Sequence, residues 1–164
     1  MTNPSPKLSA ESITNTFWPS ERFPVDPVTI ARKLGLQVLD TILPGDVSGA
    51  LIKEPGKDPV IAIHHSDSDN RKRFSCAHEL GHYILRLETN KLESVYEYID
   101  FRNAASGNGC DEEEIFANNF AANLLMPEKS VRELHKLQKS HYGMAQYFGV
   151  SNEAMNYRLN NLGL

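Results

Sequence analysis

The chain has 164 residues, of which 40% are hydrophobic and 23% charged, a composition typical of a soluble globular protein with one domain. The formal net charge of −4 argues against a protein that binds nucleic acid through charge alone, and no apolar run reaches the roughly 20 residues of a membrane span. The first ten residues carry one lysine and no apolar core, so they do not predict a secretory signal. We therefore expect a cytoplasmic protein without membrane contacts, whose two cysteines are free thiols.

The N-terminal part is predicted to be a tail followed by two helices. Residues 1–8 are rich in proline and serine and are expected to form a flexible tail. Weak helical spacing follows over residues 9–18. Asp26 is then suited to cap a helix with Pro27 at its first position, and Gly35 is suited to end it.

Three short runs of β-forming residues come next, at residues 36–39, 47–52 and 59–64. The turn-rich segment 53–58 predicts that the second and third runs pair as a hairpin. The strand Val60–His64 is a candidate to hold the backbone of an extended substrate by strand addition.

The rest of the chain is predicted to be mainly helical. The expected elements are a helix capped by Asp67 or Ser68 and ending near Leu87, a strand at 95–102, a loop at 103–109, a helix from Asp111 to Met126, a helix ending near Gln138, and two short helices. Helices, then strands, then helices predict an α+β domain with a small sheet on one side. We assign residues 9–140 to this domain and residues 141–164 to a helix-turn-helix-like C-terminal segment packed on it.

Residues 78–82 read His-Glu-Leu-Gly-His and carry the strongest functional signal. Positions four apart on a helix differ in rotation by about 40°, so His78 and His82 face the same way and can share one Zn²⁺. Glu79 lies one residue after His78, where it can hold a metal-bound water without ligating the metal itself. The alternative is a pair of core histidines satisfied by other partners. An apolar helix with this motif and no metal would leave three polar groups to satisfy, so we favour a metal site with one zinc ion per chain.

A catalytic zinc also requires a third protein ligand. The run Glu112-Glu113-Glu114 at the start of the later helix is the obvious source. Acidic side chains in a first turn also interact favourably with the helix dipole, which is the role expected for Glu112. The apolar spacing allows either Glu113 or Glu114 to face inward, so periodicity alone leaves both open.

Two segments together resemble the ImmA/IrrE family of bacterial and phage metallopeptidases. These are residues 74–83 (FSCAHELGHY) and residues 114–127 (EIFANNFAANLLMP). Residues 25–35 and 47–49 resemble the family's entry segment, and residues 148–163 resemble its closing segment. The likeness covers nearly the whole chain after the tail.

This resemblance implies a zincin-like metallopeptidase domain that uses zinc to hydrolyse a peptide bond. It implies that His78, His82 and Glu114 ligate the metal and that Glu79 is catalytic, and it favours Glu114 over Glu113. It also implies that the substrate is a regulatory protein of the repressor type, which binds DNA. The segment 88–114, with eight acidic and two basic residues, would favour such a basic substrate, although a solvated acidic loop explains it as well.

Peptide hydrolysis also needs a donor that stabilises the developing oxyanion. The candidates from the sequence are His141 and Tyr142, with His135, Tyr96 and Tyr98 also open. For each of them a surface or packing role is the alternative.

The two cysteines are not expected to take part in the chemistry. Cys76 lies two positions before His78, so on a helix it points away from the histidines and is expected to pack in the core. Cys110 is expected to be a free thiol in a loop.

The segment 145–158 has the spacing of a helix-turn-helix, with a small residue, a glycine in the turn and a serine cap. Its second helix carries only Arg158 as a cation, against Glu153, whereas DNA binding needs several phosphate contacts. We therefore interpret it as a packing corner and do not expect nucleic-acid binding. The alternative function is a DNA- or protein-binding regulator, or a toxin-system component, on a zincin scaffold with a non-catalytic metal.

Overall fold

The computed structural model of the protein describes residues 9–19, 22–89, 95–101 and 112–164. Within these ranges the chain forms seven helices and four strands, which confirms the predicted α+β class. The helices are α1 (Ala10–Phe17), α2 (Pro27–Lys33), α3 (Asp69–Glu88), α4 (Glu112–Leu125), α5 (Glu128–Lys136), α6 (His141–Phe148) and α7 (Asn152–Asn161). The strands are β1 (Gln37–Thr41), β2 (Val47–Lys53), β3 (Val60–His64) and β4 (Tyr96–Phe101). The expected tail 1–8, the loop 103–109 and Cys110 lie outside the described residues.

Short polar side chains fix where the helices begin. Asp26 accepts a hydrogen bond from the backbone nitrogen of Val28 at 3.0 Å, with Pro27 at the first position of α2. Ser68, rather than Asp67, caps α3. The prediction that a helix starts at this point is confirmed, with Ser68 as its cap.

The four strands form one sheet in the order β1-β3-β2-β4. β2 and β3 pair antiparallel, which confirms the hairpin, and β4 joins the other edge of β2, also antiparallel. β1 pairs parallel to β3. Because β3 is paired on both sides, the prediction that Val60–His64 adds a substrate strand is wrong. Among the described strands, β1 and β4 are the ones that are paired along one side only.

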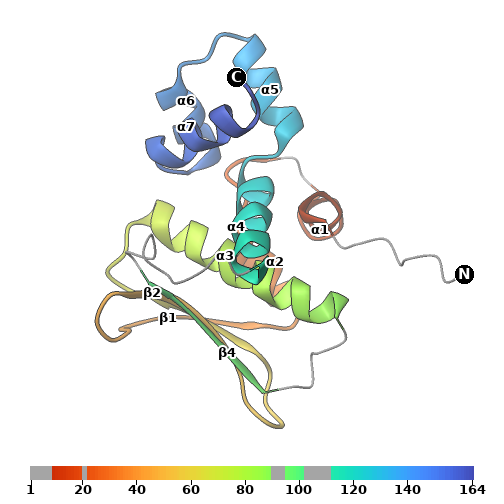
Figure 1. Ribbon diagram of the computed structural model, residues 1–164, viewed down its shortest axis with the longest axis vertical. Coiled ribbons are helices and arrows are strands. Elements are labelled where there is room, and N and C mark those ends of the chain that lie inside the picture. The colour runs from red at the N-terminus through yellow and green to blue at the C-terminus, as the bar shows by residue number, and fades with distance from the viewer. Residues whose placement is uncertain (1–8, 20–21, 90–94, 102–111) are drawn as a thin grey trace, which may run out of the picture.

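Helix α3 lies across one face of the sheet, and α4 packs on α3 from the other side (Figure 1). The segment of α3 from Ser75 to Ile84 is buried throughout. Cys76 is among these residues, and burial raises the pKa of its thiol, so it remains an uncharged packing group. A Cβ at Gly81 would lie 2.9 Å from the Cα of Ala117, so α3 and α4 approach closely because residue 81 is glycine.

Helices α5, α6 and α7 form a separate group at the end of the molecule opposite the sheet (Figure 1). Arg158 of α7 is buried and donates hydrogen bonds to the carbonyl of Met126 at 3.1 Å and to Oδ1 of Asn123 at 2.7 Å. Arg73 of α3 donates to the carbonyl of Gly149, between α6 and α7, at 2.6 Å. Arg158 is the cationic residue of α7, and its side chain therefore points into the protein. None of the helices described here is both long and apolar enough to cross a membrane.

Candidate metal centre

Helices α3 and α4 bring three potential metal ligands together. Nε2 of His78 and Nε2 of His82 lie 3.2 Å apart. The Glu114 carboxylate reaches both, with one oxygen 3.3 Å from Nε2 of His78 and the other 3.1 Å from Nε2 of His82. The three ligand atoms all lie within 4.8 Å of one another. Two residues one turn apart on α3 thus meet the first turn of α4 because the two helices cross at the Gly81 contact.

The Asn118 side chain contacts the His78 ring on the nitrogen that faces away from Glu114. Its side-chain oxygen lies 3.0 Å from Nδ1 of His78, so Nδ1 carries the proton and Nε2 offers its lone pair toward Glu114 and His82. Asn118 lies four residues after Glu114 on α4, a spacing that places both on one helix face. No role for Asn118 was predicted from the sequence, although its spacing from Glu114 could have indicated one.

The protonation states suit metal binding. Burial lowers the pKa of His82 to about 4, with a further contribution from the neighbouring His78, so His82 is neutral near pH 7. The adjacent His78 imidazole lowers the pKa of Glu114, with a further contribution from His82, so the Glu114 carboxylate is ionised. Neutral imidazoles and an ionised carboxylate are the forms that bind a metal.

This set of donors fits a zinc ion. Two imidazole nitrogens with one carboxylate oxygen is a known ligand set of catalytic zinc, with a fourth position left for water or substrate. The two Nε2 atoms lie 3.2 Å apart, and each lies within 3.3 Å of an oxygen of Glu114, so three electron-pair donors converge on one place. The geometry is therefore that of a ligand set that a cation would complete.

Glu79 is fully buried beside these ligands, on the side of α3 that faces β2. A Cβ at Gly49 of β2 would lie 3.4 Å from Oε1 of Glu79 and 3.3 Å from Cβ of Ser75. A larger residue at position 49 would press on the carboxylate. The backbone of β2 therefore passes directly against Glu79 and restricts where its side chain can lie.

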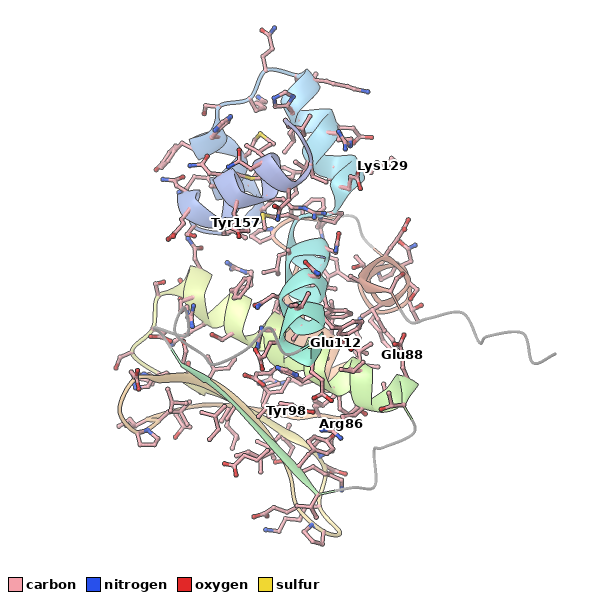
Figure 2. The ribbon with its side chains drawn as sticks, in the orientation of Figure 1. Arg86, Glu88, Tyr98, Glu112, Lys129 and Tyr157 are labelled. Atoms are coloured by element: carbon pink, nitrogen blue, oxygen red, sulfur yellow. The ribbon has the colours of Figure 1, made fainter. Side chains whose placement is uncertain are left out.

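The neighbouring Glu113 has a different set of partners. Its carboxylate accepts a hydrogen bond from the hydroxyl of Tyr98 at 2.5 Å and lies 3.8 Å from the guanidinium of Arg86. Arg86 also donates to the Tyr98 hydroxyl. Arg86 and Tyr98 lie close together between the sheet and the lower end of α4 (Figure 2). The two glutamates that periodicity could not separate thus point to different partners, and Glu114 is the one that meets the histidines.

The candidate oxyanion donors differ in how close they lie to His78, His82 and Glu114. The ring of Tyr98 stacks on the ring of His82, with centroids 4.1 Å apart and planes inclined by 13°. His141 and Tyr142 begin α6, and in the described chain His141 contacts Asn156 of α7 rather than a ligand candidate. Tyr142 is exposed. The role of these two as oxyanion donors stays a prediction, whereas Tyr98 is a candidate whose ring stacks on that of His82.

Comparison with known proteins supports a family assignment. Residues 31–160 match the IrrE N-terminal-like domain family. The chain is 30% identical over 123 residues to the metallopeptidase ImmA of Bacillus subtilis (strain 168), a match that spans 73% of this chain and 66% of that protein. A solved structure, of a Mycobacterium tuberculosis transcriptional regulator, shares the fold with a TM-score of 0.59 and 17% identity over 92% of this chain and 46% of its own.

The curated relative and the solved structure are both longer than the parts that this chain matches, so the comparison concerns the matched domain. The family match covers both the helix with the two histidines and the helix with Glu114. The chain therefore belongs to the ImmA/IrrE family, as a member of its IrrE N-terminal-like domain group.

Proposed function

We propose that this protein is a zinc-dependent endopeptidase that hydrolyses a peptide bond in a regulatory protein of the repressor type. The observation that carries the proposal is the meeting of His78, His82 and Glu114 next to the buried carboxylate of Glu79. A structural metal site needs no general base, whereas peptide hydrolysis requires one. The membership of a family with a metallopeptidase relative supports the same activity.

In this proposal each residue has a separate task. His78, His82 and Glu114 hold the ion, which when bound polarises the scissile carbonyl and lowers the pKa of water. The Glu79 carboxylate accepts the proton of the attacking water and then donates it to the leaving amine. Because residue 49 is glycine, the backbone of β2 lies close to this carboxylate and limits its movement before the substrate arrives.

The sheet offers a place for the substrate backbone. Among the described strands, β4 is paired with β2 on one side and carries Tyr98, whose ring contacts His82. An extended peptide paired with the outer edge of β4 would run beside the ligand cluster. We therefore place the substrate strand on β4, in place of β3.

The first test is zinc content per chain, measured by elemental analysis on the wild type and on three variants. We expect about one zinc in the wild type, in Glu79→Gln and in the matched control Glu112→Ala, since Glu112 is an exposed residue of the same helical turn. Glu114→Ala should hold clearly less. A wild type that takes up no zinc when zinc is supplied would refute the metal site.

The second test concerns cleavage. The zinc-loaded wild type and Glu79→Gln would each be incubated with a lysate of the source cell, and new N-termini would be mapped by mass spectrometry. We expect new termini in a DNA-binding repressor with the wild type and a loss of at least about 100-fold in their rate of appearance with Glu79→Gln. Equal cleavage by both proteins would refute the proposed role of Glu79.

A further inference from the structure

The two histidine ligands are supported in different ways. Nδ1 of His78 is held by the side-chain oxygen of Asn118 at 3.0 Å. Nδ1 of His82 is buried and has no hydrogen-bond partner among the residues that the structure describes. Metal-binding histidines usually have their second nitrogen held by a hydrogen bond, which fixes the direction of the ligating nitrogen. Something else must therefore keep the His82 ring in its orientation.

The face of the His82 ring is covered by Tyr98. The ring centroids lie 4.1 Å apart and the ring planes are inclined by 13°, so the two rings are stacked. The His78 ring meets His82 on another side at 4.8 Å and 80°. A ring packed against the face of His82 blocks rotation about its Cβ–Cγ bond, the same motion that a hydrogen bond at Nδ1 would restrain.

Tyr98 is itself anchored to both helices that carry ligands. Its hydroxyl donates to Glu113 of α4 at 2.5 Å and accepts from Arg86 of α3. The guanidinium carbon of Arg86 lies 5.1 Å from the centre of the Tyr98 ring and 5.2 Å from that of Tyr96. The hydroxyl of Tyr98 is thus fixed by hydrogen bonds, while the face of its ring packs against the His82 ring.

We infer that Tyr98 is a positioning residue for the metal site, and that its ring face orients the His82 imidazole as the Asn118 side chain orients that of His78. The inference rests on the proposed metal site at His78, His82 and Glu114. It assigns a function to the aromatic ring of Tyr98 and none to its hydroxyl beyond holding the ring in place.

The test is the zinc affinity of Tyr98 variants, measured by competition with a chromophoric chelator. Tyr98→Leu removes the stacked face, and we expect its zinc dissociation constant to rise about tenfold or more, as for other outer-shell partners of zinc ligands. Tyr98→Phe keeps the face and loses the hydroxyl anchor, so its dissociation constant should rise much less than that of Tyr98→Leu. Tyr96→Leu is the matched control because Tyr96 lies on the same strand and under the same arginine, and it should bind zinc like the wild type.

Two further readouts separate positioning from general stability. Thermal unfolding with chelator present reports whether Tyr98→Leu destabilises the metal-free fold. In the wild type, proton NMR of His82 should show a clear upfield ring-current shift that persists in Tyr98→Phe, a readout that does not depend on the folding of the leucine variant.

Three outcomes would overturn the inference: unchanged zinc affinity in Tyr98→Leu, an equal loss in Tyr98→Phe, or no upfield shift in the wild type. The second outcome would assign the effect to the hydroxyl. A wild type that binds no zinc would instead overturn the proposed function, so the two failures are distinct.

Discussion

The side-chain oxygen of Asn118 lies 3.0 Å from Nδ1 of His78, on the side of the ring away from Glu114. This contact leaves Nε2 of His78 as the nitrogen with the lone pair. Replacing Asn118 with alanine should therefore weaken zinc binding by about 10- to 100-fold, the usual effect of losing an outer-shell partner.

Competition with a chelator would measure the affinity of Asn118→Ala. The adjacent Asn119, an exposed residue of the same helix, provides the control, and Asn119→Ala should bind zinc like the wild type. Asn118→Asp keeps an acceptor at the same place and should retain most of the affinity. An Asn118→Ala protein with wild-type affinity would show that the contact does not orient the ring.

The contact between Gly81 and Ala117 should determine whether Glu114 reaches the histidines. An added Cβ at Gly81 would lie 2.9 Å from the Cα of Ala117 and 3.2 Å from its carbonyl oxygen, so Gly81→Ala must move α4 away from α3. We expect a fall in zinc content and a loss of about 1–3 kcal/mol in the free energy of unfolding. Gly143→Ala in α6 is the control, because its Cβ would meet only the hydroxyl of Ser140. Full zinc occupancy in Gly81→Ala would contradict the packing argument.

The stability of the metal-free protein should decrease in mild acid. Burial lowers the pKa of His82 from 6.5 to about 4, so between these pH values the unfolded chain binds more protons than the folded one. The free energy of unfolding should therefore fall as the pH drops from about 6.5 to about 4. The lowered pKa of Glu114 adds a further decrease below its ordinary value of 4.5.

Denaturant titrations with chelator present, at a series of pH values, would measure this slope. His82→Gln should flatten it between pH values of about 6.5 and 4, whereas His141→Gln, at an exposed ring, should leave it unchanged. A wild-type protein equally stable across that range would show that His82 is not held neutral by burial.

Arg158 should contribute to stability and not to DNA binding. Arg158→Met would leave the carbonyl of Met126 and Oδ1 of Asn123 without their donor, at a cost of about 1–3 kcal/mol. Lys129→Met, at an exposed position, should change the free energy of unfolding by less than about 0.5 kcal/mol. Duplex DNA titrated with the wild type at two salt concentrations should show no salt-dependent binding, and such binding would revive the regulator alternative.

The order and type of the elements could be predicted because each has a local signal. Ser68 and Asp26 mark helix starts, and the turn at 53–58 marks the hairpin. The position of β1 beside β3 could not be predicted, because a parallel pair is joined by a long connection and its register depends on distant contacts. Because this pairing was not predicted, Val60–His64 was expected to have a free edge for a substrate.

In the site, too, features within one helix could be predicted, whereas contacts between elements could not. The spacing of His78 and His82 lies within one helix and can be read from the sequence, but the choice between Glu113 and Glu114 depends on what faces each of them. In the structure Arg86 and Tyr98 hold Glu113, and the histidines hold Glu114. The stacking of Tyr98 on His82 joins a strand to a helix, for which no spacing rule exists.

The three proposed ligands lie on two helices, α3 and α4, and this arrangement has a thermodynamic consequence. A bound ion would act as a cross-link that closes residues 83–113 into a loop, and it would bind the folded chain only. The melting temperature would then depend on the concentration of free zinc, with about 2.7 kcal/mol added at 100 times the dissociation constant. The supply of metal would thus control how long the folded protein survives, as well as whether it is active.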